Sequence, residues 1–131
     1  ELTDIYATLA EIVDQPVQQG TSGADSFSFL PLLKGKNEAT RPFAIHHSIR
    51  GTFALRRGQL KLIEGRGSGG FTKPRVLTSK PGDPPGQLYN LGEDPQERVN
   101  LWQARSEDVK AMQKLLDAVR SSSARAVAIA P

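Results

Sequence analysis

The sequence predicts an α+β fold, in which a small four-stranded antiparallel sheet packs against a C-terminal helix and a further helix lies at the N-terminus. Three short runs rich in apolar residues indicate an antiparallel meander: Pro42–Ser48, Thr52–Arg56 and Leu60–Glu64. Gly51 and Gly58 lie in the two gaps, where tight turns are expected. Segments with helical periodicity flank these runs and predict helices that cover the sheet.

Alternation of side chains supports the strand assignment of the middle run. Phe53 and Leu55 alternate with Ala54 and Arg56. A period of two gives a strand one buried face and one wetter face. The fourth strand is expected at Gln87–Leu91, which reads QLYNL and extends the meander.

The N-terminal part of the chain is expected to form a helix, a loop and a short apolar plug. Residues Leu2–Val13 carry apolar side chains at spacings of three and four, which form one stripe of a helix: Leu2, Ile5, Leu9 and Val13. Pro16 disfavours helix in the residue before it and so ends this element. Gln18–Ser28 is polar and predicts a loop, whereas Phe29–Leu33 predicts a short helical turn.

Glycine and proline predict loops between the meander and the last helix. Gly65–Gly70 lacks the spacing of a phosphate-binding loop, so it is interpreted as a mobile hairpin tip. Phe71–Pro85 is rich in proline and is expected to be an irregular surface excursion. Asp94 is suited to cap a helical turn over Pro95–Val99, because proline is favoured at the first helical position.

The last helix is expected to begin at Ser106, which is followed by two acidic residues that complement the helix dipole. Its apolar stripe would lie across the apolar face of the sheet and consists of Val109, Met112, Leu115, Leu116 and Val119. We therefore expect a single domain over residues 1–120, with helix and plug in 1–35 and sheet and helix in 41–120. Residues 121–131 are expected to form a weakly ordered tail.

Composition restricts what stabilises the chain. Its 131 residues include no cysteine, so disulfides and cysteine-based metal sites are excluded. No apolar run approaches the roughly 18 residues needed to cross a bilayer, and no signal-peptide pattern is present. The chain opens at Glu1 rather than Met, and we expect it to be a piece of a longer protein.

Positive charge is concentrated in the middle of the chain. Between Arg50 and Lys80 there are eight basic residues and one acidic residue. Such a segment attracts an anionic partner, such as nucleic acid, a sulfated sugar or a membrane surface, or it is simply a solvated face with a basic loop. Phe53 and Phe71 are the two aromatic residues among these charges, fewer than recognition of single strands by stacking favours. Arg56, Arg57 and Lys61 either bind an anion or pair with carboxylates such as Glu64.

Three segments, in order, resemble the C-terminal subdomain of type I sulfatases (arylsulfatases) of the alkaline-phosphatase-like superfamily. Leu2–Val13 with Ser28–Gly35 resembles the exit from the catalytic domain, and Gly51–Ile63 is similar to the following hairpin. Residues 88–101, LYNLGEDPQERVNL, match the family signature "LYdL-x-x-DP-x-E-x-x-NL". Leu60 stands where an aromatic residue is frequent, and Asn90 replaces the usual aspartate.

The resemblance implies a parent enzyme that hydrolyses sulfate esters with a formylglycine and Ca²⁺. That formylglycine forms from the first residue of a C/S-x-P-x-R motif, which this chain lacks; Thr72–Arg75 has the outline but begins with threonine. We therefore expect no catalytic residue, no metal ligand and no cofactor in this chain, and no activity from it alone. The resemblance implies a parent located in the periplasm or outside the cell.

Four residues are candidates for substrate binding in the intact enzyme: His46, His47, Ser48 and Arg50. In sulfatases this subdomain leans over the active-site pocket, where a histidine at a strand end can donate to a sulfate oxygen or a sugar hydroxyl. The alternative is that the histidines are packed in the sheet or exposed at its edge. Neighbours on a strand point to opposite faces, so the two cannot jointly hold one metal ion.

Other residues of the matched segments are expected to be structural. Glu97 and Asn100 are interpreted as stabilising a turn, and Tyr89 and Trp102 as anchors of the core or of a domain interface. The expected partners are the catalytic domain of the same protein and a sulfate-ester substrate, with self-association through an exposed junction surface over Leu2–Val13 and Phe29–Leu33. No membrane or nucleic acid partner is expected. The alternatives are a related phosphonate or phosphodiester hydrolase and a free-standing module that binds anions or glycans.

Overall fold

The computed structural model describes residues 1–15, 17, 23 and 25–121. Pro16, part of the expected 18–28 loop and the expected tail beyond Ser121 lie outside the described residues. The chain divides into two compact units, one centred on Glu1–Pro42 and the other comprising Phe43–Asp117. The predicted sheet lies entirely in the second unit.

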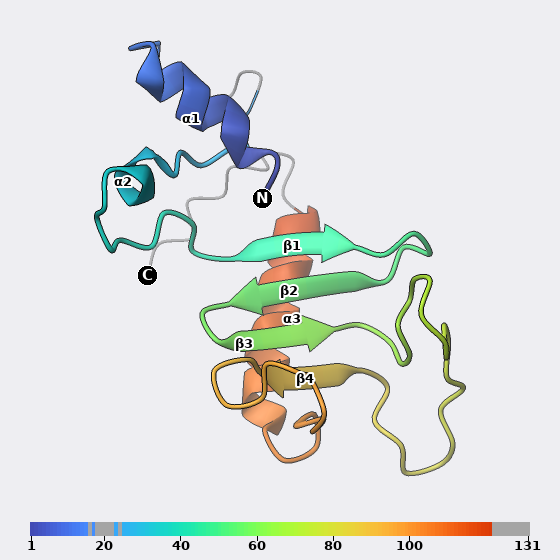
Figure 1. The fold of residues 1–131 in the computed structure, drawn as a ribbon. Helices are drawn as coiled ribbons and strands as arrows, with labels where there is room; N and C mark the ends of the chain where they lie inside the picture. The colour runs from blue at the N-terminus through green and yellow to red at the C-terminus, as the bar shows by residue number, and fades with distance from the viewer. Residues whose placement is uncertain (16, 18–22, 24, 122–131) are drawn as a thin grey trace. The chain divides into compact units, whose positions relative to one another are not determined.

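Four antiparallel strands form one sheet in the order β1-β2-β3-β4, as predicted (Figure 1). Their bounds are β1 Ala44–His47, β2 Phe53–Arg57, β3 Leu60–Ile63 and β4 Gln87–Asn90. The register places Leu55 opposite Leu62, and Leu62 opposite Leu88. A continuous apolar row therefore crosses the three strands and requires a cover.

Helix α3, Ser106–Ser121, covers this row and lies across one face of the sheet (Figure 1). The resulting buried core consists of Leu55, Leu62, Leu88, Val109, Met112 and Leu116. Burial of each such side chain stabilises the fold by about 1.5–3 kcal/mol in transfer terms. The predicted α+β class and the packing of the C-terminal helix on the sheet are confirmed.

The predicted helical turn over Pro95–Val99 is wrong. Glu97 has a left-handed backbone with φ 56°, which is incompatible with a right-handed helical turn. The Asp94 carboxylate instead accepts hydrogen bonds from the backbone N–H of Arg98 at 2.7 Å and of Val99 at 2.8 Å. Asp94 therefore accepts hydrogen bonds from backbone N–H groups as the N-cap residue of a helix does, but here these bonds close a non-helical turn.

We expect Leu116→Ala to lower the free energy of unfolding of the second unit by about 2–5 kcal/mol, because it leaves a cavity under the leucine row. Leu116 is 0% exposed, whereas Val99 is 60% exposed, so Val99→Ala is the control and should change stability by less than about 0.5 kcal/mol. Urea denaturation followed by Trp102 fluorescence measures both. Equal effects of the two substitutions would contradict the assigned core.

The first unit contains α1, Asp4–Ile12, and the short α2, Leu30–Leu33, in agreement with the predicted helix and apolar plug. The buried residues of α1 are Asp4, Ala7 and Thr8. Most of its large apolar side chains are exposed instead, among them Leu2, Ile5, Tyr6, Leu9, Ile12 and Val13. The buried side of α1 therefore consists of small and polar residues, and hydrogen bonds satisfy its polar groups.

Asp4 is the centre of those hydrogen bonds. Its carboxylate accepts from the Arg41 guanidinium and, at 2.9 Å, from the backbone N–H of Phe27. Arg41 also donates to the carbonyl oxygen of Asp25 at 2.7 Å and lies over the Phe27 ring at 4.5 Å. Burial alone raises the pKa of Asp4, but hydrogen bonds from Arg41 and Phe27 outweigh it and lower the pKa to about 2.

Because the pKa of Asp4 lies below its ordinary value of 3.8, the ionised carboxylate stabilises the folded first unit above about pH 4. This contribution, on the order of 2 kcal/mol, is lost as the pH falls toward about 2. Urea titrations at pH 7, 4 and 2.5, followed by the amide NMR signals of α1, measure it. Asp4→Asn should remove most of this pH dependence, whereas Glu11→Gln, at an exposed site of the same helix, should leave it intact.

Candidate anion-binding site

The two histidines predicted to bind substrate are exposed on β1. His46 lies opposite Ala54 in the register and His47 opposite Phe53. The His47 ring lies 5.7 Å from the Phe53 ring, and its Nδ1 is 2.9 Å from the carbonyl oxygen of Ser48. His47 is therefore held at the end of the strand by an aromatic contact and a backbone hydrogen bond.

Ser48 shapes the turn between β1 and β2. Its hydroxyl oxygen accepts hydrogen bonds from the backbone N–H of Arg50 at 3.3 Å and of Thr52 at 3.2 Å. The backbone N–H of Ser48 donates to the carbonyl oxygen of Thr52 at 2.9 Å. Ser48 thus closes the turn, while the Arg50 side chain remains exposed.

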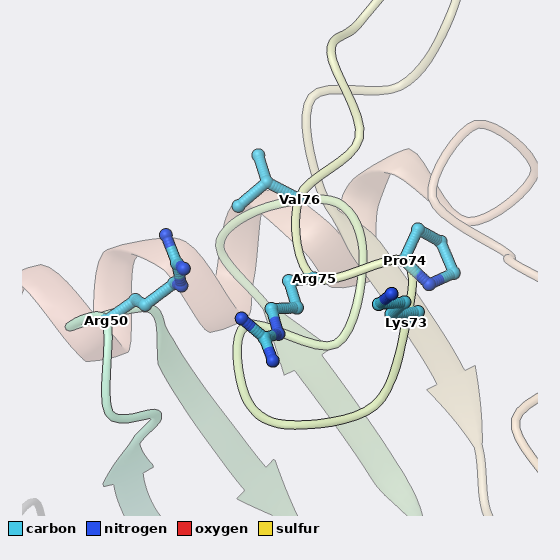
Figure 2. Close-up of a pocket in the computed structure, with 5 residues that line it drawn as sticks. All are labelled: Arg50, Lys73, Pro74, Arg75 and Val76. Carbon is cyan, nitrogen blue, oxygen red and sulfur yellow. The ribbon is translucent and has the colours of Figure 1, made fainter.

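Arg50 lines an open depression of about 720 Å³ on the second unit. Its lining, which we call the basic depression, consists of Arg50, Lys73, Pro74, Arg75 and Val76 (Figure 2). Arg50 comes from the β1–β2 turn, and the other four come from the long connection between β3 and β4. Two segments that are distant in sequence thus bring three cationic side chains to one place.

The long connection folds back on itself beside the depression. The backbone N–H groups of Ser68 and Gly69 donate to the carbonyl oxygens of Pro74 and Arg75, at 3.0 and 2.9 Å. Leu77 donates to the carbonyl oxygen of Arg66 at 3.2 Å. The glycine-rich segment therefore holds residues 74–77 in place, and the N–H groups of Ser68 and Gly69 are engaged within the protein rather than directed at a phosphate.

Gly69 joins this connection to the β1–β2 turn. It is buried, and its φ of +61° is one that favours glycine. A Cβ atom at this position would lie 2.9 Å from the Ser48 hydroxyl oxygen and 3.3 Å from the Thr52 Cβ. Only glycine permits this approach, which places the segment that carries Lys73 and Arg75 against the turn that carries Arg50.

Some basic residues of this region form ion pairs with carboxylates, and others do not. Lys61 Nζ lies 2.6 Å from Glu97 Oε1, and Arg66 lies 2.5 Å from Asp83 Oδ2. The Lys80 backbone N–H, together with Arg66, holds the pKa of Asp83 below its ordinary value. Among the described residues, no carboxylate pairs with any of the three cations of the basic depression: Arg50, Lys73 and Arg75.

The polar residues of the 88–101 signature stabilise the backbone around β4. The Asn100 side chain accepts from Leu88 N–H and donates to the Gly86 carbonyl oxygen, both at 3.0 Å. Asn90 accepts from Gly92 N–H at 3.1 Å, so the amide fills a structural position where aspartate is usual. Burial, with nearby carboxylates, raises the pKa of Tyr89, whose hydroxyl donates to Gln87. These contacts support the structural interpretation of the signature.

Neither a metal cluster nor a membrane span is found in the part of the chain that the structure describes. Within it, no three His, Asp or Glu side chains are grouped to hold a metal ion. The described residues thus do not fit the Ca²⁺ of sulfatases. No described helix is both long enough and apolar enough to cross a bilayer.

Comparison with known proteins shows homology to sulfatases. The chain is 31% identical over 121 residues to an N-acetylgalactosamine-6-O-sulfatase of Bacteroides thetaiotaomicron, which covers 90% of this chain and 23% of that protein. A solved structure from work on glycosaminoglycan metabolism in the same organism is 29% identical, with a TM-score of 0.70 over 91% of this chain and 24% of the other. No family model matches.

A second solved structure from Bacteroides thetaiotaomicron shows the same fold. It matches 88% of this chain and 23% of the other with a TM-score of 0.59 and 22% identity. The chain therefore spans about a quarter of the length of each of these relatives. The chain is homologous to a part of sulfatases, as its motifs indicate.

The sequence did not indicate that Lys73 and Arg75 line the same depression as Arg50. Both were counted in the basic middle of the chain, but nothing local to residues 71–77 shows that they approach the β1–β2 turn. The available signal was the excess of positive charge in a loop rich in glycine and proline. An excess of positive charge identifies a basic segment, but it does not show which of its side chains lie close together in the fold.

We expect Gly69→Ala to be more disruptive than Gly58→Ala. Both glycines have left-handed φ, +61° and +57°, so alanine at either position costs about 1 kcal/mol. Only at Gly69 does the added Cβ meet other atoms, whereas at Gly58 nothing lies within 4 Å. Gly69→Ala should therefore also shift the amide NMR signals of Arg50 and Arg75. Unchanged signals in both variants would contradict the contact between loop and turn.

Proposed function

We propose that residues 1–120 are the C-terminal subdomain of a sulfate-ester hydrolase, and that the catalytic domain lies in another part of the same protein. The observation that carries this proposal is the 31% identity to an N-acetylgalactosamine-6-O-sulfatase over 90% of the chain. The formylglycine and Ca²⁺ chemistry of that reaction belongs to the catalytic domain. Sulfated sugars are the substrate class that the relative's name suggests.

The first unit is proposed to pack on the catalytic domain. Large apolar side chains of α1 and α2 are exposed in the described structure, among them Ile5, Leu9, Ile12, Leu32 and Leu33. An exposed apolar surface of this kind supports a role as an interface. Without its partner the same surface is available for self-association, which agrees with the junction surface expected from the sequence.

The end of β1 and the following turn are proposed to line the substrate pocket. His46, His47 and Arg50 are exposed on the second unit and can donate hydrogen bonds to sulfate or sugar oxygens. Ser48 is assigned a positioning role, because its hydroxyl oxygen already accepts two backbone hydrogen bonds. Specificity would then depend on the histidines and on Arg50.

The test compares this chain with the full-length protein that contains it. We expect the chain alone to leave an aryl sulfate intact and the full-length protein to hydrolyse it. In the full-length protein, His46→Ala, His47→Ala or Arg50→Ala should change the ratio of kcat/KM between two sulfated sugars by about tenfold, the equivalent of one strong hydrogen bond. Arg57→Ala, at an exposed position of β2, is the control and should leave this ratio unchanged.

Three outcomes would contradict parts of the proposal. Turnover of aryl sulfate by this chain alone would place the catalytic centre within it. Faster hydrolysis of an aryl phosphate than of an aryl sulfate by the full-length protein would favour the phosphonate or phosphodiester hydrolase instead. Unchanged selectivity in all three variants, with activity retained, would remove these residues from the pocket.

A further inference from the structure

We propose that the basic depression binds a short oligosaccharide that carries sulfate or carboxylate groups. Because Arg50 also belongs to the proposed substrate pocket, the basic depression extends that pocket, and its ligand class rests on the proposed function. The proposal is supported by three cations without carboxylate partners among the described residues, by the apolar surface beside them, and by a loop that hydrogen bonds tie to β4.

The charge of the depression is available to a ligand. Arg50, Lys73 and Arg75 line it, whereas the side chains of Lys61 and Arg66 are paired with carboxylates. A guanidinium presents donors in a planar fork that fits two oxygens of a sulfate or carboxylate group. Two such forks and one ammonium suit a ligand with more than one anionic group.

Size and lining favour an anionic sugar over a single small anion. The depression extends over about 720 Å³ and is open to solvent, so a ligand would lie along it rather than be enclosed. Pro74 and Val76 add apolar surface to the lining of the depression, which suits the C–H faces of sugar rings (Figure 2). An isolated sulfate ion would use neither the volume nor this surface.

The loop that carries Lys73 and Arg75 is ordered by the protein itself. Gln87 Nε2 donates to the carbonyl oxygens of Gly65 at 2.8 Å and Gly67 at 3.2 Å, which ties the start of the loop to β4. A Cβ atom on Gly67 would lie 2.8 Å from the Pro74 carbonyl oxygen, so the two arms of the loop are in close contact. Ordering before binding lowers the entropic cost of binding.

Nucleic acid is a less suitable ligand for this depression. Recognition of single strands relies on bases that stack on aromatic side chains, and no aromatic side chain lines the depression in the described structure. A nucleic acid is therefore used as a competing probe in the test and not as the proposed ligand.

The experiment titrates the protein with a heparin-derived hexasaccharide and follows its amide NMR signals at 0.05 and 0.15 M salt. We expect the largest shifts at residues 48–52 and 66–77, with weaker binding at the higher salt because the charges are exposed. A hyaluronan hexasaccharide, which has carboxylates and no sulfates, distinguishes the two anionic groups. Binding of either sugar at these residues supports the proposal.

Matched variants test whether the depression itself is responsible. Replacement of its three cations by glutamine (Arg50→Gln, Lys73→Gln, Arg75→Gln) should weaken binding at least tenfold. The control removes the same charge from exposed cations that do not line the depression (Arg57→Gln, Lys80→Gln, Arg98→Gln) and should change binding by less than about threefold. Arg50→Gln alone, which leaves the loop untouched, should weaken binding by about threefold to fivefold.

Several results would overturn the proposal. Equal losses in the two triple variants would show attraction to overall charge only. Equal affinity for a single-stranded hexanucleotide, with shifts at the same residues, would exclude a sugar-specific site. Absence of shifts at residues 48–52 and 66–77 with both hexasaccharides would exclude the site. Because only binding is measured, these results are independent of whether the full-length protein hydrolyses a sulfate ester.

Discussion

The leucine row across β2, β3 and β4 is the feature on which the second unit depends. Leu55, Leu62 and Leu88 are neighbours in the register, and α3 covers them with Val109, Met112 and Leu116. A one-residue slip of any strand would move its leucine to the opposite face. Burial of this row therefore fixes the register, and the register in turn fixes where the turns and loops begin.

Outside the core, hydrogen bonds from side chains to the backbone hold the loops. Asn100 links β4 to the segment before α3, Ser48 closes the β1–β2 turn, and Gln87 ties down the glycine-rich segment. The sulfatase-like signature is thus largely a set of structural contacts. The chemistry open to this chain lies in the exposed residues that these contacts position, above all the cations of the basic depression.

The first unit is stabilised mainly by polar contacts rather than by an apolar core. Its helix α1 buries Asp4 and Thr8 in a network with Arg41 and Ser26 and leaves much of its apolar side uncovered. Periodicity correctly predicted the helix, because helical spacing depends on neighbouring residues, although Leu2 and Val13 of the expected stripe lie just outside it. The buried pairing of Asp4 with Arg41, 37 positions apart, has no local signal in the sequence.

Alternation, helical periodicity and motifs are local properties of the chain, and they were enough to predict the α+β class, the strands, the last helix and the homology to sulfatases. The helical turn after Asp94 was predicted wrongly, since capping residues serve helical and non-helical turns alike. Which cations are neutralised and which gather at the basic depression became visible in the folded chain. Whether a charge has a partner depends on segments distant in sequence, and the buried sheet and its loops bring these segments together.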